Sequence, residues 1–213
     1  MNTITDISQL DFDKKYTYKD YLTWKFKERV ELIKGYLFRM SPAPTSEHQM
    51  ISNKISTPIT IFLSDTKCKL FYAPFDVRFY DQNDPTKAIT NVVQPDISVI
   101  CDSEKIDRRG CLGAPDLIVE ILSPSTSEKD LTWKYDLYEE SGVKEYWVVN
   151  PTEKNMMIYT LDHEGKYQPS RLFTRGDVIS SLVLKGFSLN LSDVFEPFDW
   201  EAHEAIERTY NRV

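Results

Sequence analysis

The clearest pattern along the chain is a set of three short apolar runs that are rich in β-branched residues. They cover residues 92–100, 115–122 and 145–150, and their length and composition predict strands that are buried on both faces. Between the second and third runs, residues 125–142 have apolar positions at helical spacing, with Ser and Thr as candidate caps at the start and Gly142 at the end. A helix between two buried strands predicts a βαβ crossover and a locally parallel sheet.

Weaker patterns flank this centre. Further helices are expected over residues 17–29, 47–64 and 200–212, the second of them crossed by Pro58. Further strands are expected in a hairpin that turns at Lys34-Gly35, in residues 70–80 and in a hairpin that turns at His163 to Gly165. These elements predict an α/β (α+β) fold in which a central mixed sheet is flanked by helices.

The length of 213 residues is enough for one large core and short for two. No repeat, low-complexity tract or linker-like stretch divides the chain. We therefore expect a single domain over residues 1–213, with its core at about residues 15–195.

Acidic residues interrupt two of the predicted buried strands. Asp96 lies in the first strand and Glu120 in the second, between Val119 and Ile121. An unpaired ionised carboxylate in such a place is strongly destabilising. If the two strands are neighbours, opposed side chains have Cβ atoms about 5 Å apart, so both acids could hold one Mg²⁺ or Mn²⁺. Without a cation, one acid would need a raised pKa or a basic partner.

Lys134 is the candidate basic partner. In the predicted helix, Leu131, Tyr135 and Tyr138 form a core-facing stripe, and Lys134 lies at its border, from where it could point over the strand ends. A lysine beside a metal-bound phosphodiester could stabilise the charge that develops at phosphorus or orient the attacking water, whose pKa the metal would lower. Two acids and a lysine therefore indicate hydrolysis of a phosphodiester.

Each of these residues also has a purely structural interpretation. Asp96 follows a proline, where aspartate is often a turn or cap residue, and Glu120 could form a structural ion pair. A lysine at the border of a helical stripe usually extends to water, and a strand acid near a turn, such as Glu31, is commonly exposed. His48, in the first turn of a predicted helix, is expected to be a surface or capping residue. Asp116 is expected to cap or salt-bridge the entry of its strand.

Aromatic residues near the candidate site are interpreted as core residues rather than as platforms on which nucleobases stack. The interpretation covers Trp133, Tyr135, Tyr146 and Trp147. No Gly-rich phosphate loop, no Cys or His pair at zinc spacing and no Gly-flanked serine elbow is present in the sequence. The paired carboxylates therefore carry nearly all of the functional signal.

Charge and cysteine content narrow the class of protein further. A formal charge of -7 and a pI near 5.1 weigh against a polyanionic partner, but they still allow a local basic groove. Three cysteines, at positions 68, 101 and 111, fit no metal-ligand spacing and are odd in number, so we expect no disulfide framework. We also find no targeting segment and no apolar stretch of about 20 residues. A cytoplasmic location is expected.

The strings "VVQPDISVI", "PDLIVEILSPST" and "KYDLYEESGVKEYWVVNP", with "VELIKGYL" and "SPAPTSEHQ" upstream, resemble the Uma-two family of putative restriction endonucleases. This family is a branch of the PD-(D/E)XK nuclease superfamily, and the resemblance covers roughly residues 15 to 195. It implies a restriction-endonuclease-like fold, in which a central mixed sheet carries an acid on each of two adjacent strands.

Residue by residue, Pro95-Asp96 matches the PD element of the superfamily and Glu120 matches its D/E position. The motif lysine is absent, because Leu122 stands where the superfamily has Lys. Some members supply this lysine from the following helix, and Lys134 is the residue that could fill the gap. Glu31 resembles the further acid that many members contribute from an N-terminal element. Gln94 resembles a polar accessory ligand.

Two hypotheses from different classes follow from this reading. The first is a Mg²⁺-dependent endonuclease that cuts DNA, with Asp96 and Glu120 as metal ligands, Lys134 as electrostatic stabiliser and Glu31 as an outer acid. The second is a catalytically inactive binding or assembly module with the same fold, which the acidic pI and the missing motif lysine favour. Cutting both strands of a duplex calls for two active sites, so a homodimer is expected.

Overall fold

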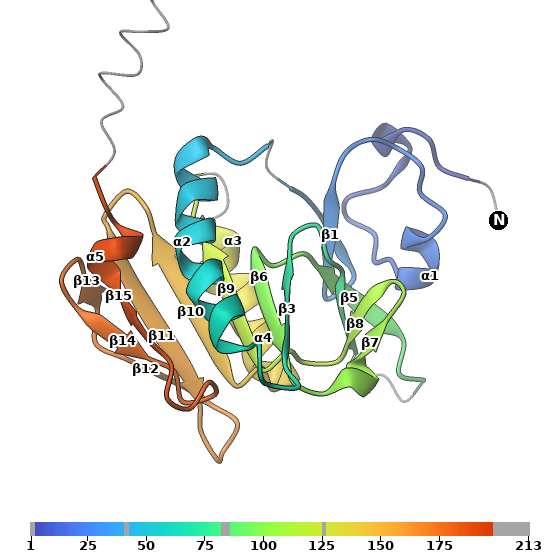
Figure 1. Cartoon of the computed structure of the whole chain (residues 1–213). Coiled ribbons are helices and arrows are strands. Elements are labelled where there is room, and N and C mark those ends of the chain that lie inside the picture. The colour runs from blue at the N-terminus through green and yellow to red at the C-terminus, as the bar shows by residue number, and fades with distance from the viewer. Residues whose placement is uncertain (1–2, 41–42, 82–85, 125–126, 198–213) are drawn as a thin grey trace, which may run out of the picture.

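The computed structural model of the chain describes residues 3–40, 43–81, 86–124 and 127–197, and Figure 1 shows how their elements are arranged. The helix that the sequence predicts over residues 200–212 lies outside the described residues. No helix in these four ranges combines the length and the apolar character that a membrane crossing needs.

A seven-stranded mixed sheet carries the central apolar runs. Its order is β12-β11-β10-β9-β6-β3, and β13 pairs with β11. The strands are β3 (Lys69–Tyr72), β6 (Ile97–Ile100), β9 (Leu117–Ile121), β10 (Glu145–Asn150), β11 (Asn155–Leu161), β12 (Tyr167–Pro169) and β13 (Phe173–Thr174). β9 and β10 run parallel, whereas β6 pairs with β9 in antiparallel orientation. The predicted βαβ crossover is therefore confirmed.

The connection between β9 and β10 is helical, but it has three parts. They are α3 (Ser127–Lys129), a π-helical segment (Asp130–Lys134) and α4 (Tyr135–Ser141). Gly142 ends α4 in the left-handed conformation, at φ 83°, as the sequence predicts for a helix terminus.

The seven-stranded sheet is the central mixed sheet flanked by helices that the sequence predicts, but the structure adds a second, six-stranded sheet that the sequence does not predict. The order of this second sheet is β2-β1-β5-β4-β8-β7, and only β4 and β8 run parallel. The strands are β1 (Val30–Ile33), β2 (Tyr36–Arg39), β4 (Val77–Tyr80), β5 (Ile89–Val93), β7 (Ile106–Asp107) and β8 (Gly110–Leu112). The predicted strand over residues 70–80 divides between the two sheets, because the chain turns after β3 and the rings of Phe71 and Phe75 stack with centroids 4.1 Å apart.

Smaller elements complete the described chain. They are η1 (Ile7–Gln9), α1 (Tyr18–Tyr21), η2 (Ser103–Lys105), α5 (Leu191–Val194) and a two-stranded sheet of β14 (Val178–Ser180) and β15 (Ser188–Asn190). The predicted hairpins at Lys34-Gly35 and His163 to Gly165 are confirmed as β1 with β2 and β11 with β12.

Helices cover the two faces of the seven-stranded sheet, as Figure 1 shows. On one face lies α2 (Ser46–Phe62), whose Ile51, Ile55 and Ile59 pack against apolar residues of β6, β9 and β10. On the other face, Leu137 and Tyr138 of α4 pack in a second cluster that also contains residues of the six-stranded sheet. The hydroxyl of Thr45 caps the start of α2.

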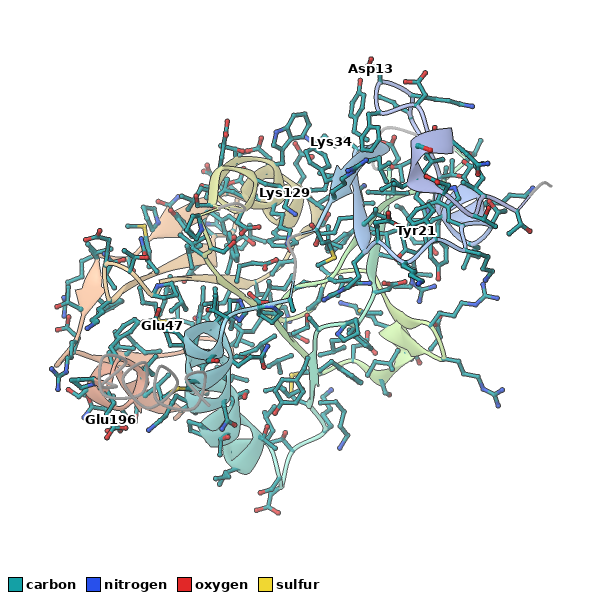
Figure 2. All side chains as sticks on the ribbon, turned by 90° about the horizontal axis from the view of Figure 1, so that it is seen from above. Asp13, Tyr21, Lys34, Glu47, Lys129 and Glu196 are labelled. Atoms are coloured by element: carbon teal, nitrogen blue, oxygen red, sulfur yellow. A yellow bond between two sulfur atoms is a disulfide. The ribbon has the colours of Figure 1, made fainter. Side chains whose placement is uncertain are left out.

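The N-terminal segment forms a third apolar cluster on the outer side of the six-stranded sheet. Figure 2 shows Tyr21 in this segment, at the opposite end of the molecule from Glu196, which follows α5. The helix predicted over residues 17–29 is wrong beyond Tyr21, because the aromatic residues pack among themselves instead of along a helix face. For example, the ring centroid of Trp24 lies 5.3 Å from that of Tyr16 and 5.5 Å from that of Tyr21.

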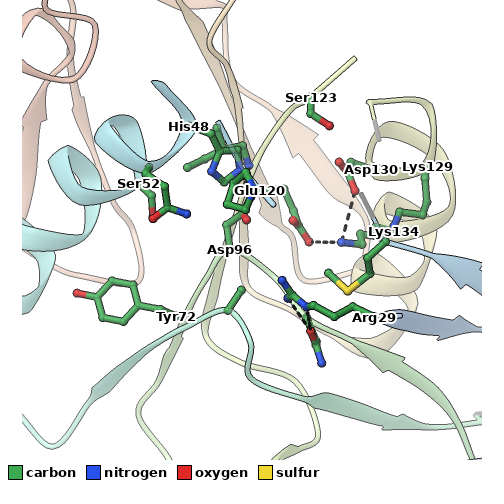
Figure 3. Close-up of a pocket in the computed structure, with 16 residues that line it drawn as sticks. Arg29, His48, Ser52, Tyr72, Asp96, Glu120, Ser123, Lys129, Asp130 and Lys134 are labelled. Atoms are coloured by element: carbon green, nitrogen blue, oxygen red, sulfur yellow. Dashed lines mark hydrogen bonds and ion pairs between the residues drawn. The ribbon is translucent and has the colours of Figure 1, made fainter. Parts of the chain in front are cut away.

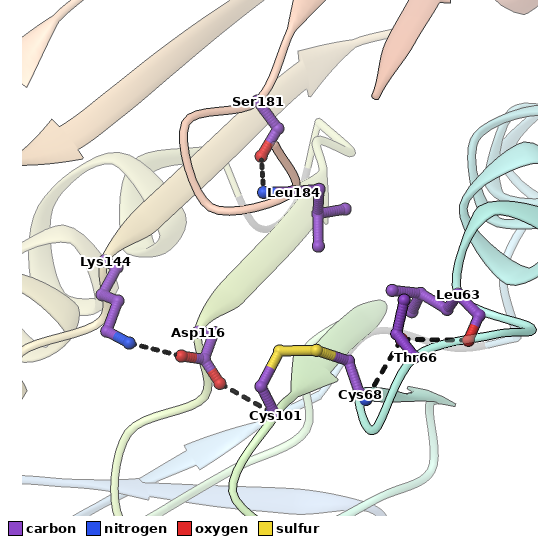
Figure 4. The surroundings of a disulfide bond; sticks show 8 residues. All are labelled: Leu63, Thr66, Cys68, Cys101, Asp116, Lys144, Ser181 and Leu184. Carbon is purple, nitrogen blue, oxygen red and sulfur yellow. Dashed lines mark hydrogen bonds and ion pairs between the residues drawn. A yellow bond between two sulfur atoms is a disulfide. The ribbon is translucent and has the colours of Figure 1, made fainter. Parts of the chain in front are cut away.

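Cys68 and Cys101 form a disulfide bond, which corrects the expectation of no disulfide (Figure 4). The register of β3 with β6 pairs Lys69 with Ile100, so the two cysteines lie opposite each other one position further along. Their separation of 33 residues in the sequence gives no sign of this pairing. Cys111 is free and buried.

Candidate active site

The acidic pair lies where β6 and β9 meet. The register of this antiparallel pair places Ile97 opposite Val119, so Asp96 lies beside Glu120 one position further along. The carboxylate of Asp96 accepts a hydrogen bond at 2.8 Å from the backbone N–H of Ile121, which follows Glu120. The prediction that the two acids come from neighbouring strands is confirmed.

A cavity of about 260 Å³ opens at this end of the seven-stranded sheet (Figure 3). Asp96, Glu120 and Lys134 all line it, so the structure brings three predicted site residues to one place. The remaining lining residues come from the residue before β1, the segment between β2 and α2, the first turns of α2, the end of β3, the loop before β6, the end of β9 and the helical connection. They include Arg29, His48, Ser52, Tyr72, Gln94, Ser123, Lys129 and Asp130.

Lys134 lies among three carboxylates instead of extending to water. Its Nζ is 2.8 Å from Oε1 of Glu120, 3.0 Å from Oε1 of Glu31 and 3.4 Å from Oδ1 of Asp130. Only 3% of the residue is exposed. A buried ammonium group needs such compensation, and the contact with Asp130 is an ion pair without the geometry of a hydrogen bond.

The π-helical segment explains how Lys134 reaches this place. It turns both Asp130 and Lys134 toward the site and buries them, whereas Leu131 is 45% and Trp133 41% exposed. The prediction that Leu131 belongs to the core-facing stripe and the interpretation of Trp133 as a core residue are therefore wrong. A π turn is wider than an α turn, so the phase of the apolar face of α4 does not extend back to Leu131. Such turns often mark functional sites.

Glu31 of β1 lies behind the cavity, with none of its surface exposed. Besides Lys134, its carboxylate pairs with Lys129 and accepts the backbone N–H of Gln94 at 3.0 Å. Burial by itself would raise the pKa of Glu31, but the two ammonium groups and this N–H lower it to about 2. The exposed position that the structural interpretation of Glu31 assumes is therefore wrong.

Glu120 has the opposite shift. Its burial raises its pKa, the ammonium group of Lys134 lowers it, and the negative charges of Asp130, Asp96 and Glu31 raise it further, so that the net direction is upward. Tyr138 donates a hydrogen bond to the same oxygen as Lys134, Oε1, at 2.7 Å. In the absence of a cation, Glu120 therefore has both features that the sequence suggests for a buried acid, a basic partner and a raised pKa.

Two residues of the site were missed by sequence reasoning. Nε2 of His48 lies 3.3 Å from Oδ2 of Asp96, and the contact with Asp96 raises the pKa of His48 against the effect of burial. Asp130 is a third buried acid on the cavity wall. The local sequence carries no signal for either position, because one depends on how α2 sits over the sheet end and the other on the π turn.

Gln94 lines the cavity, but its side chain is engaged away from the acidic pair. Its amide donates a hydrogen bond to Asp76 at 2.8 Å and accepts one from Arg29 at 2.7 Å. Gln94 contacts the site through its backbone N–H, which donates a hydrogen bond to the carboxylate of Glu31.

The donor set fits a hydrated divalent cation. Within residues 3–40, 43–81, 86–124 and 127–197, no three His, Cys, Asp or Glu side chains form a ready-made metal cluster. Mg²⁺, however, usually keeps several waters and binds proteins through one or two carboxylates. The described contacts of Asp96 all use Oδ2 and those of Glu120 all use Oε1, so the second oxygen of each carboxylate could serve a cation.

Acidification is expected to remove the stabilising contribution of Glu31. Because its pKa in the folded state lies below the ordinary value of 4.5, this contribution is present above pH 4.5 and is lost as the pH falls toward 2. Urea unfolding of the wild type and of Glu31→Gln, measured without divalent ions across this range, should show a wild-type advantage that shrinks with acidification. A constant advantage would contradict this assignment. Glu140→Gln is the control, because the Glu140 side chain is exposed and paired only with Lys34 among the described contacts.

Comparisons with known proteins show what the chain is similar to in fold and in sequence. A crystal structure from Anabaena variabilis ATCC 29413, described as a putative nuclease belonging to DUF820, shares the fold with a TM-score of 0.65. It is 20% identical and covers 84% of this chain and 97% of its own. The uncharacterized protein slr1290 of Synechocystis sp. (strain ATCC 27184 / PCC 6803 / Kazusa) is 26% identical over 156 residues, which are 72% of this chain and 78% of that protein.

The family model described as "Uma2: Putative restriction endonuclease" matches residues 18–192. This range includes all the acids and lysines of the site, which are Glu31, Asp96, Glu120, Lys129, Asp130 and Lys134. The match extends from α1 to the start of α5. The chain therefore belongs to the Uma2 family of putative restriction endonucleases.

Proposed function

We propose that this protein is a divalent-metal-dependent endonuclease that hydrolyses phosphodiester bonds of DNA. The observation that carries the proposal is the placement of Asp96 and Glu120 side by side on one cavity wall, with the ammonium group of Lys134 bonded to Glu120. The description of the family as "putative restriction endonuclease" and of the Anabaena structure as "a putative nuclease" supports DNA as the substrate.

In this proposal, Asp96 and Glu120 hold one Mg²⁺ or Mn²⁺. The cation would act as a Lewis acid toward the phosphoryl group and lower the pKa of a bound water. Lys134 stabilises the negative charge that develops on the phosphoryl oxygens, because its ammonium group lines the same cavity. Lys134 would thus supply the function of the motif lysine, whose position in the sequence is occupied by Leu122. Glu31 is an outer acid that holds Lys134 and Lys129 in position.

The balance of charge in the cluster also supports a cation. Four carboxylates, of Asp96, Glu120, Asp130 and Glu31, lie with two ammonium groups, of Lys129 and Lys134, whereas the guanidinium group of Arg29 on the cavity wall is hydrogen-bonded to Gln94. The formal charge of the six groups is about -2 when His48 is neutral, and about -1 when Arg29 is counted, so an excess of negative charge remains for a divalent cation to compensate. Burial is the largest cause of the raised pKa of Glu120, and this excess of negative charge adds to it in the absence of the cation.

A catalytically inactive binding or assembly module is the second candidate. The observation that favours it is that Glu31 and Glu120 already have lysine partners, so the cluster is partly compensated without metal. The overall charge of -7 points the same way.

Nicking of supercoiled plasmid separates the two candidates. The wild type should convert supercoiled DNA to the open-circle form with Mg²⁺ or Mn²⁺, and excess EDTA should abolish this activity, because the proposed chemistry needs the cation. An inactive module would give identical blanks in both conditions and for an Asp96→Asn/Glu120→Gln double variant. Sedimentation analysis of the same preparation would test the expected homodimer.

A further inference from the structure

Tyr72 is a half-exposed aromatic residue on the wall of the candidate active site. It ends the edge strand β3, is 50% exposed and lines the same cavity as Asp96. Figure 3 shows its ring on one side of Asp96 and Lys134 on the other. A half-exposed ring at the open side of a polar cavity is placed to meet a ligand that has an apolar face.

The backbone holds Tyr72 close to the acidic pair. In the register of β3 with β6, Tyr72 lies opposite Ile97, and Asp96 is the residue before Ile97. The next residue, Ala73, donates its N–H to the carbonyl oxygen of Asp96 at 3.2 Å. On the other side, the hydroxyl of Tyr72 lies 3.5 Å from that of Thr60 on α2. Tyr72 is therefore held at the end of the sheet next to the backbone of Asp96, on the wall of the cavity that both residues line.

We propose that Tyr72 stacks on the nucleobase next to the scissile phosphate, and that the preferred substrate is therefore DNA with unpaired nucleotides. This inference rests on the proposed nuclease function. In a duplex both faces of each base are covered by its neighbours, so an aromatic side chain can stack on a base only where the strand is single or the base is turned out. Arg29 lines the same cavity and, because its guanidinium group is bonded to the neutral side chain of Gln94, offers positive charge to a flanking phosphate.

Binding of fluorescent oligonucleotides tests the inference. We would measure fluorescence anisotropy of a labelled single-stranded oligodeoxynucleotide and of the matching duplex, with Ca²⁺ in place of Mg²⁺. The wild type should bind the single strand more tightly, and Tyr72→Ala should weaken this binding about 5- to 150-fold. Tyr72→Phe keeps the ring and should bind as the wild type does. Tyr80→Ala is the matched control, because Tyr80 is also exposed and does not line this cavity.

Kinetics give a second readout. With Mg²⁺ and a single-stranded substrate, Tyr72→Ala should raise KM and leave kcat nearly unchanged, because the stacked base contributes equally to the ground and transition states. Equal affinity of wild type and Tyr72→Ala, a preference of the wild type for duplex, or an effect of Tyr72→Ala on the oligomeric state alone would overturn the inference.

The outcomes separate this inference from the proposed function. A protein that binds single strands through Tyr72 but never cuts them would keep the stacking site and reject the nuclease. A protein that cuts DNA with an unchanged KM in Tyr72→Ala would keep the nuclease and reject the stacking site.

Discussion

Replacing Lys134 by methionine is expected to lower the free energy of unfolding by about 3–5 kcal/mol. Methionine fills a similar volume, but it leaves the buried carboxylates of Glu31, Glu120 and Asp130 without the ammonium group that they share. Lys129 would still pair with Glu31. Chemical denaturation without divalent ions at neutral pH would measure the effect.

Lys54→Met is the control for this experiment. Lys54 also pairs with an acid, Glu196, at 2.7 Å, but both side chains are exposed, by 41% and 65%. Such pairs contribute about 0–1 kcal/mol, so the control should unfold close to the wild type. If Lys134→Met were as stable as the Lys54→Met control, the described cluster would not hold in solution.

Asp96→Asn is expected to reduce the rate of metal-dependent DNA cleavage by about 100-fold or more, because it removes one of two charged ligands of the proposed cation. The fold should persist. The amide oxygen of asparagine can still accept the N–H of Ile121 that Asp96 accepts now. Initial rates of plasmid nicking at saturating Mg²⁺, with a circular dichroism spectrum of each variant, would measure both effects.

Asp116→Asn provides the matched control for this change. Asp116 precedes β9 at the strand end opposite Glu120, where it accepts the N–H of Cys101 and pairs with Lys144, as predicted for a residue at the strand entry (Figure 4). It does not line the cavity. Cleavage by Asp116→Asn should equal that of the wild type. Equal cleavage by Asp96→Asn would remove Asp96 from the active site.

The central crossover could be predicted from the sequence because its signals are local. Strands β9 and β10 are short, apolar and β-branched, and Gly142 ends the helix between them. The two acids stood out for the same reason, since a carboxylate inside such a run needs compensation. The alternation of side chains along a strand predicted that the two acids would face each other only if their strands were neighbours, and the pairing of β6 with β9 meets that condition.

Features that depend on distant contacts could not be predicted. The disulfide of Cys68 with Cys101 follows from the register of β3 with β6, and the division of residues 70–80 follows from their assignment to two sheets. The N-terminal helix stops at Tyr21 because aromatic packing around Trp24 prevails over helical spacing.

Within the site, the limit of the sequence lies in the helical connection. Lys134 lies beside Glu120 as its basic partner, as predicted. The helix phase on which that prediction rested is wrong, because the π turn buries Asp130 and exposes Leu131. A π-helical segment of five residues is too short to show as a periodic spacing of apolar residues in the sequence. His48 was set aside as a surface or capping residue, and its contact with Asp96 could not be predicted because it joins the start of α2 to a sheet end far along the chain.

The central claim is that Asp96 and Glu120 together hold one divalent cation. Isothermal titration calorimetry of the wild type and of the Asp96→Asn/Glu120→Gln variant with Mn²⁺ and Mg²⁺ tests it most directly. The account predicts one saturable site per chain in the wild type and none in the double variant. A wild type that takes up no cation at millimolar concentrations, or a double variant that binds as the wild type does, would contradict it.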